Sequence, residues 1–145
     1  MSAAAHAPVA DDRRLTVAIA SKPSLRPAWQ QLVGLLRHRG TPVRVISTWI
    51  DEIPGPDSNW NQEWMRSIDE AASADLLLAR VCVDDNADVV AVQVGAALGA
   101  GKQVAILGSH PLLDRLSTHP RVDFRVPDAA PEAIDDVLRA RGRLP

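Results

Sequence analysis

The segment from Ala74 to Gly108 constrains the fold more than any other part of the chain. Two runs of apolar residues, at 75–83 and 103–107, have the length and composition of fully buried strands. Between them lie a short acidic loop and a helical pattern over about 88–100, which carries small residues on one face. A buried strand, a helix and a second buried strand in this order predict a βαβ unit, in which the two strands run parallel.

The same alternation extends over the rest of the chain. Further strands are predicted at residues 15–20, 42–47 and 122–126, the last of them at an edge of the sheet. Helical spacing of apolar residues predicts one helix between Pro27 and Gly40, a second after Asn59 with Trp60, Trp64, Ile68 and Ala71 on one face, and a third beginning at Pro131. Strands that alternate with helices predict an α/β fold, a flavodoxin-like doubly wound parallel sheet of about five strands in the order 2-1-3-4-5.

Composition limits the domain organisation and the partners. The chain has 145 residues, of which 46% are hydrophobic, and a formal net charge of −2. We expect a flexible tail at residues 1–14 and a single domain at residues 15–145. The charge indicates no nucleic-acid partner, and no apolar run approaches the ~20 residues that span a membrane. Cys82 is the only cysteine, and its apolar neighbours predict a buried thiol in a cytoplasmic protein.

Topology indicates where a ligand would bind. In the order 2-1-3-4-5 the switch point lies between the strands at 15–20 and 75–83. We therefore predict a pocket lined by the residues at the ends of these strands, 20–22 and 83–85, beside the start of the helix at about 88–100. The four histidines are dispersed, and the chain has no dinucleotide-binding or phosphate-loop glycine motif, so we expect no metal and no cofactor.

The helix at about 88–100 and the turn after it contain Gly95, Ala97, Gly101 and Lys102, preceded by Gln93. This pattern resembles the motif E-x-G-x-A-x-x-x-G-K of the nucleoside 2-deoxyribosyltransferase family, whose glutamate is the catalytic nucleophile. The resemblance implies that Gln93 stands at the position of the nucleophile and that Gly95 lies close to a bound sugar. The alternative is that Gln93 is an ordinary polar residue of a helix.

By the same resemblance, Asp75 and Asp85 are catalytic candidates. The family carries a pocket aspartate before the corresponding strand, which Asp75 matches, and an aspartate in a D-x-G-T motif ahead of the glutamate. Asp85 lies near that second position, but the Gly-Thr is missing and the spacing to Gln93 differs. Alternatively, Asp75 is a polar residue at the start of a strand, and the acids of the loop are solvated or cap the following helix.

The ends of the first two strands resemble a small bacterial and phage-borne branch of the same superfamily. That branch has an Ala-Ser-Lys sequence after the first strand, matched by Ala20, Ser21 and Lys22, and a Ser-Thr-Trp-Ile-Asp sequence after the second, which includes Trp49 and Asp51. The resemblance implies that these five residues bind the substrate, with the indole stacked on a flat base and the serine and lysine on a phosphate or sugar oxygen. The alternative for Trp49 is an anchor of the core or of an interface.

The resemblance implies a homo-oligomeric protein that binds a nucleoside, a nucleotide or a related N-glycoside. The family activity is base exchange or hydrolysis at the N-glycosidic bond, which passes through an oxocarbenium-like state. An amide at position 93 has no negative charge with which to stabilise that state, so we expect the activity to be impaired. A non-catalytic nucleotide sensor and an oligomeric interaction module are the alternative functions.

Overall fold

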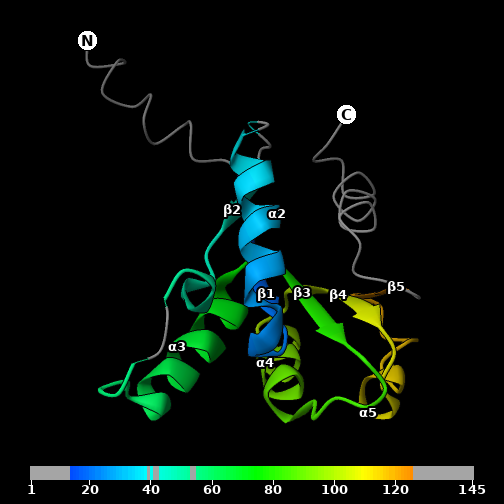
Figure 1. Cartoon of the computed structure of the whole chain (residues 1–145). Helices are drawn as coiled ribbons and strands as arrows, with labels where there is room; N and C mark the ends of the chain where they lie inside the picture. The colour runs from blue at the N-terminus through cyan, green and yellow to red at the C-terminus, as the bar shows by residue number, and fades with distance from the viewer. Residues whose placement is uncertain (1–13, 39, 41–42, 53–54, 126–145) are drawn as a thin grey trace.

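The computed structural model describes residues 14–38, 40, 43–52 and 55–125, and its centre is a parallel sheet of five strands (Figure 1). The strands are β1 (Leu15–Ala20), β2 (Val43–Val45), β3 (Leu76–Val81), β4 (Gln103–Gly108) and β5 (Val122–Arg125). Their order is β2-β1-β3-β4-β5, and each neighbouring pair is parallel. The predicted α/β fold and strand order are therefore confirmed. The predicted helix at Pro131 and, except for Arg14, the predicted tail lie outside the described residues.

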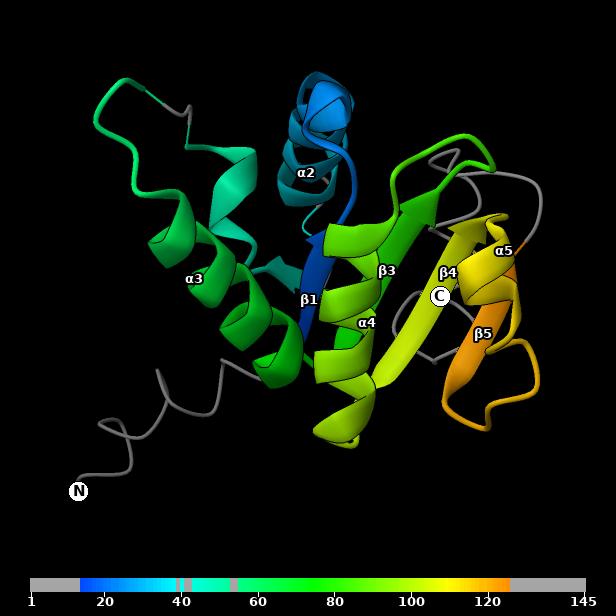
Figure 2. The same cartoon turned by 90° about the horizontal axis from the view of Figure 1, so that it is seen from below.

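Helices cover both faces of the sheet (Figures 1 and 2). α2 (Arg26–His38) packs on one face, whereas α3 (Trp60–Ser73), α4 (Asp88–Gly99) and the short α5 (Pro111–Asp114) pack on the other. Two 3-10 helices, η2 (Pro23–Leu25) and η3 (Thr48–Ile50), come after β1 and β2. None of the helices in the described ranges has the length and apolar character needed to cross a membrane.

Alternate side chains of the central strands enter two separate cores. Val17 and Ile19 of β1 lie in the core beneath α2, whereas Ala18 and Ala20 lie in the core beneath α4. All four are at most 2% exposed, as expected for a central parallel strand that is buried on both faces. Full burial of a valine or isoleucine side chain contributes about 1.5–3 kcal/mol, so the two helical layers hold β1 firmly at the centre.

Several boundaries differ from the prediction, each for a local reason. β3 is shorter than residues 75–83, because the Asp75 amide bonds to the Thr16 hydroxyl (2.9 Å) and Cys82, which is partly exposed rather than buried, already begins a turn. β2 ends at Val45, although the Ser47 hydroxyl still accepts a hydrogen bond from the Ile19 amide (2.7 Å). After β4 the chain forms the short helix α5, in which the Leu112 amide donates a hydrogen bond to the ring of the N-cap residue His110 (3.1 Å).

The predicted apolar face of α3 is a core face only in part. Asn59 caps the helix as expected, since its side chain accepts a hydrogen bond from the Gln62 amide (3.1 Å). Ala71 is buried in the core, but Trp60 and Trp64 are 60% and 44% exposed. Figure 2 shows that α3 and α4 diverge toward their first turns. The two tryptophans therefore face the space between the helices.

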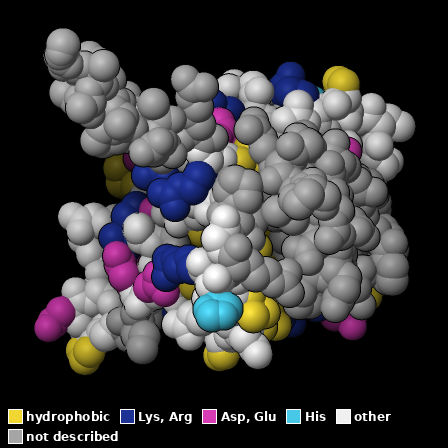
Figure 3. All heavy atoms as spheres, turned by 90° about the horizontal axis from the view of Figure 1, so that it is seen from above, with side chains coloured by type: hydrophobic (Ala, Val, Ile, Leu, Met, Phe, Trp, Pro, Cys, Tyr) yellow, Lys and Arg dark blue, Asp and Glu magenta, His cyan; other side chains and the backbone are white. Residues whose placement is uncertain are grey.

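Acidic and basic side chains are interspersed on the surface opposite to the view of Figure 2. In Figure 3, Lys and Arg side chains lie next to Asp and Glu side chains, with no continuous patch of either sign among the residues that the structure describes.

Gly108 provides a test of the β3–β4 contact. It ends β4 with a φ of +94°, and a Cβ built on it would lie 1.9 Å from the Val81 carbonyl oxygen. We expect Gly108→Ala to lower the free energy of unfolding by about 1–3 kcal/mol or more, measured by urea denaturation. As a control, Gly34→Ala lies in α2 with open space around it and should raise stability by about 0.5–1 kcal/mol. Equal stability of Gly108→Ala and the natural chain would contradict the close approach.

Candidate functional site

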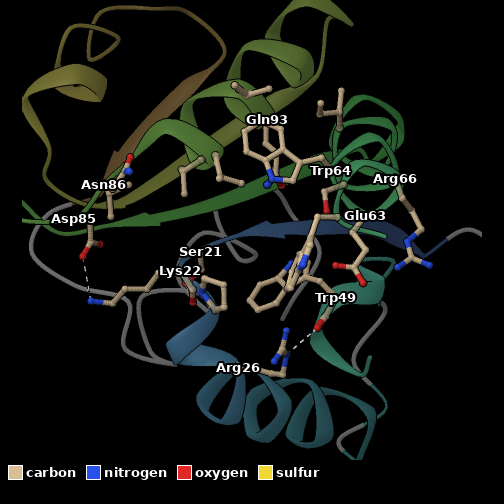
Figure 4. A pocket seen from close by; sticks show the side chains of 18 of the residues that line it. Ser21, Lys22, Arg26, Trp49, Glu63, Trp64, Arg66, Asp85, Asn86 and Gln93 are labelled. Carbon is tan, nitrogen blue, oxygen red and sulfur yellow. Dashed lines mark hydrogen bonds and ion pairs between the residues drawn. The ribbon is translucent and has the colours of Figure 1, made fainter. Parts of the chain in front are cut away.

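A pocket of about 200 Å³ opens at the carboxyl edge of the sheet, between α2, α3 and α4. Its walls come from the residues after β1, from η3, from the first half of α3 and from the first turns of α4. This is the switch point of the sheet, where β1 and β3 are adjacent and their connections leave to opposite faces. The pocket therefore lies at the place where the strand order predicts a ligand site (Figure 4).

The structure brings five of the candidate residues together around this pocket. Its lining includes Ser21, Lys22, Trp49, Asp85 and Gln93. They come from four separate segments, which meet only because the parallel strands end at the same edge. This arrangement agrees with the grouping that topology and the resemblance indicate.

Three further candidates lie near the pocket without lining it. Ala20 is the last residue of β1 and is fully buried in the core beneath α4. Asp51 is exposed and points to Arg37, with 3.9 Å between Oδ2 and Nη2. Gly95 lies on an exposed part of α4, with no atom within 4 Å of the position of a Cβ. None of the three is placed to contact a ligand in the pocket.

Asp75, the other catalytic candidate, is not among the residues that line the pocket. Asp75 precedes β3 and so lies at the amino edge of the sheet, opposite to the pocket. Its Oδ2 accepts hydrogen bonds from the backbone amide of Thr16 (2.9 Å) and from the Thr16 hydroxyl (3.0 Å). The carboxylate thus ties the start of β1 to the start of β3, which is the alternative role of a polar residue at a strand start.

Gln93 is the most deeply buried polar side chain of the pocket wall. It is 6% exposed and lies on the inner face of α4 with Val90, Val94 and Ala97. No described residue forms a hydrogen bond with its side-chain amide, although an amide can donate two and accept two. The fully buried side-chain atoms without a partner in the described residues are Trp29 Nε1 and Arg121 Nε, so the Gln93 amide is not one of them and is accessible from the pocket. Gln93 is therefore not an ordinary surface residue of the helix.

Lys22 and Asp85 form an ion pair that joins the loops after β1 and β3. The Lys22 Nζ lies 3.0 Å from Asp85 Oδ1, and Asp85 Oδ2 accepts a hydrogen bond from the Cys82 amide (2.9 Å). Partial burial raises the pKa of Asp85, but these two bonds and the charges of Lys22 and Arg80 outweigh it, and the pKa is lowered. Asp85 therefore stays ionised near neutral pH and is poorly suited to protonate a leaving base.

The indole of Trp49 is held in a fixed orientation. Its Nε1 donates a hydrogen bond to the Ile19 carbonyl (2.8 Å), and its own carbonyl accepts one from Arg26 Nε (2.9 Å). The Arg26 guanidinium also lies 5.7 Å from the centre of the Trp49 ring, within the range of a cation–π contact. The ring thus packs partly on the core beneath α2 and also lines the pocket.

The pocket lining also includes residues that the sequence does not indicate as candidates, among them Arg26, Trp60, Glu63 and Trp64. The spacing of four residues between Trp60 and Trp64 is that of a helix face packed on the core, so the sequence predicts that role for them. A signal that distinguishes them is their place in the first half of a helix that begins beyond the carboxyl edge of the sheet. Arg26 and Glu63 have no such signal, since single charged residues at helix starts are common.

The pocket has an aromatic end and a polar end (Figure 4). In this view Trp49, Glu63 and Trp64 lie at one end, and Lys22, Asp85 and Asn86 lie at the other. Ser21 and Gln93 lie between them on opposite walls, and Arg26 projects from α2 toward the aromatic end. A ligand with one flat apolar part and one polar part matches this arrangement.

Solved structures of other proteins resemble the chain in fold. The CMP N-glycosidase of Clostridium botulinum is 17% identical to the chain with a TM-score of 0.60, and the match covers 87% of this chain and 98% of that protein. A 2-deoxyribosyltransferase of Leishmania mexicana is 16% identical with a TM-score of 0.51, covering 86% and 96%. No family model matches the chain, and no curated protein has a significantly similar sequence. At these identities the comparison shows that the chain shares the fold of these proteins.

Glu70 of α3 forms hydrogen bonds with the first residue of η3. Both of its carboxylate oxygens lie 3.3 Å from the Thr48 backbone amide, next to Trp49. Burial raises the pKa of Glu70, and the bonds from Thr48 and the charge of Arg66 offset only part of that rise. Because the folded state binds the proton more tightly than the unfolded state, this residue favours folding when protonated, and that contribution is lost as the pH rises through the raised pKa.

We expect Glu70→Gln to remove this part of the pH dependence. The amide oxygen can still accept from Thr48, but it carries no charge that burial disfavours. The stability of the variant relative to the natural chain should therefore increase as the pH is raised from about 4 to about 7, measured by urea denaturation at each pH. Asp69→Asn, on an exposed turn of the same helix, serves as the control for removal of one carboxylate from α3. A relative stability that falls with pH would contradict the raised pKa.

Proposed function

We propose that this protein binds a nucleoside or nucleotide in the pocket at the carboxyl edge of the sheet. The observation that carries the proposal is the side chain of Gln93, which belongs to a residue only 6% exposed and presents its amide on the pocket wall with no hydrogen-bond partner among the described residues. A ligand with hydroxyl or carbonyl groups would satisfy it. The tryptophans at the other side of the pocket supply surfaces on which a flat base can stack.

The two ends of the pocket suit the two parts of such a ligand. We place the base at the aromatic end, against Trp49, and the sugar next to Gln93 and Ser21. The Arg26 guanidinium forms no ion pair with a described acid and has donors left beyond its bond to the Trp49 carbonyl. It lies beside the Trp49 ring, so these donors are available to a ligand at the aromatic end of the pocket.

Binding, rather than rapid cleavage, is the function that these residues support best. Cleavage of an N-glycosidic bond requires a carboxylate near the anomeric carbon and an acid near the leaving base. Gln93 supplies an amide in place of the first, Asp85 is held ionised by Lys22, and Asp75 lies at the opposite edge of the sheet. We propose a nucleotide-binding protein of low N-glycosidase or transferase activity, which is the sensor alternative raised by the sequence.

A homo-oligomer in the cytoplasm completes the proposal. Trp60, Met65, Val89 and Val92 are large apolar side chains of α3 and α4, and each is at least 40% exposed. Side chains of this kind on neighbouring helices favour a contact with a second copy of the chain. The oligomer size follows from light scattering of the purified protein.

Calorimetric titration with nucleosides and their monophosphates tests the binding function. We expect at least one of these ligands to bind, and Trp49→Ala to weaken that binding by about 1–3 kcal/mol, the range for loss of an aromatic surface under a base. Trp49→Phe keeps a ring but lacks the donor to Ile19, so most of the affinity should remain. Failure of every nucleoside and monophosphate to bind would refute the proposed function, and equal loss in both variants would assign Trp49 to packing alone.

Restoring a carboxylate at position 93 tests the account of low activity. Gln93→Glu should release free base from deoxynucleosides or their monophosphates faster than the natural chain does, measured by chromatography of the free base. The introduced carboxyl would be buried, which raises its pKa, so the gain should grow as the pH rises and the group ionises. Brisk turnover by the natural chain, unchanged by the substitution, would place the nucleophile elsewhere.

A further inference from the structure

Glu63 is the carboxylate of the pocket for which the structure gives no partner. Asp85 is paired with Lys22, and Glu52 accepts hydrogen bonds from the Arg66 guanidinium. No described residue donates a hydrogen bond to the Glu63 side chain or pairs with its charge, although this residue is only partly exposed. The charge therefore remains available to a ligand that donates hydrogen bonds.

The neighbours of Glu63 place it at the aromatic end of the pocket. Glu63 and Trp64 follow Trp60 by three and four residues on α3, so both neighbour it on the helix surface. All three residues line the pocket. Figure 4 shows the Glu63 side chain extending from α3 on the same side as Trp49 and Trp64, away from Lys22 and Asp85. A base stacked on an indole at this end would present its edge, rather than its face, to the carboxylate.

We infer that Glu63 recognises the base and selects guanine. This inference rests on the proposed function and specifies its ligand. A carboxylate offers two acceptor oxygens side by side and no donor, so it pairs best with two parallel N–H groups. Among the unmodified bases only guanine has two adjacent donors on one edge, the N1–H and the exocyclic amino group.

The other bases bring an acceptor toward the carboxylate. The amino groups of adenine and cytosine lie next to the ring acceptors N1 and N3, and the N3–H of uracil lies between two carbonyl oxygens. Each of these can form one hydrogen bond with Glu63 while placing a lone pair against its second oxygen. The sugar hydroxyls are a less suitable partner, because the polar residues suited to them lie toward the other end of the pocket.

Competition calorimetry with GMP, IMP, AMP, CMP and UMP on the full chain tests the inference. GMP should bind roughly 5- to 150-fold more tightly than the other four, the selectivity expected for one bidentate contact. IMP is the decisive ligand, because it differs from GMP only by lacking the exocyclic amino group. dGMP should bind as tightly as GMP, since Glu63 is assigned to the base rather than to the ribose 2′-hydroxyl.

Glu63→Gln should reduce the affinity for GMP by a similar factor and bring GMP close to the other ligands, because an amide replaces one acceptor with a donor. Asp69→Asn, an exposed acid on the same helix, removes the same charge outside the pocket and should change nothing. Equal binding of all five nucleotides, or a GMP preference that survives Glu63→Gln, would overturn the inference while leaving the proposed function standing. If none of the nucleotides binds, both are refuted.

Discussion

The parallel pairing of β1 with β3, buried on both faces, is the constraint on which the rest of the structure depends. Their alternating side chains enter two cores, so helices must cover both faces of the sheet. The chain leaves β1 toward α2 on one face and leaves β3 toward α4 on the other. Because the two connections separate at this point, a hollow forms between them, and the polar residues that follow the strands face it.

The walls of the hollow are held by the sheet rather than by a ligand. Ile19, near the end of β1, accepts a hydrogen bond from the Trp49 indole at its carbonyl and donates one from its amide to the Ser47 hydroxyl. These bonds attach η3 and the residue before it to β1. Asp85 joins the loop after β3 to Lys22 after β1. A site on rigid elements loses little conformational freedom on binding, which favours affinity. These contacts within the chain orient the Trp49 ring and join two walls of the pocket.

The polar groups of the pocket divide into those that hold the fold and those that remain for a ligand. Lys22 with Asp85 and Arg66 with Glu52 are paired. Beyond its bond to the Trp49 carbonyl, the Arg26 guanidinium has further donors, and among the described residues nothing pairs with the side chains of Glu63 and Gln93. These three groups lie beside three tryptophans, an arrangement that suits a ligand with one flat apolar part and one polar part.

The sequence by itself determined the order and direction of the strands, because periodicity and turn residues are local and parallel strands follow from the alternation with helices. It also placed Ser21, Lys22, Asp85 and Gln93 at one edge, since the carboxyl ends of parallel strands coincide. The family motif groups Asp75 with these residues, but the topology does not. A residue that precedes β3 lies at the opposite edge of the sheet, where Asp75 bonds to Thr16. Only the tertiary structure decided that Trp60 and Trp64 face a pocket and that Glu63 has no described partner. Those outcomes depend on how far α3 diverges from α4 and on which charges meet across the chain, and neither is encoded in the spacing of residues along one helix.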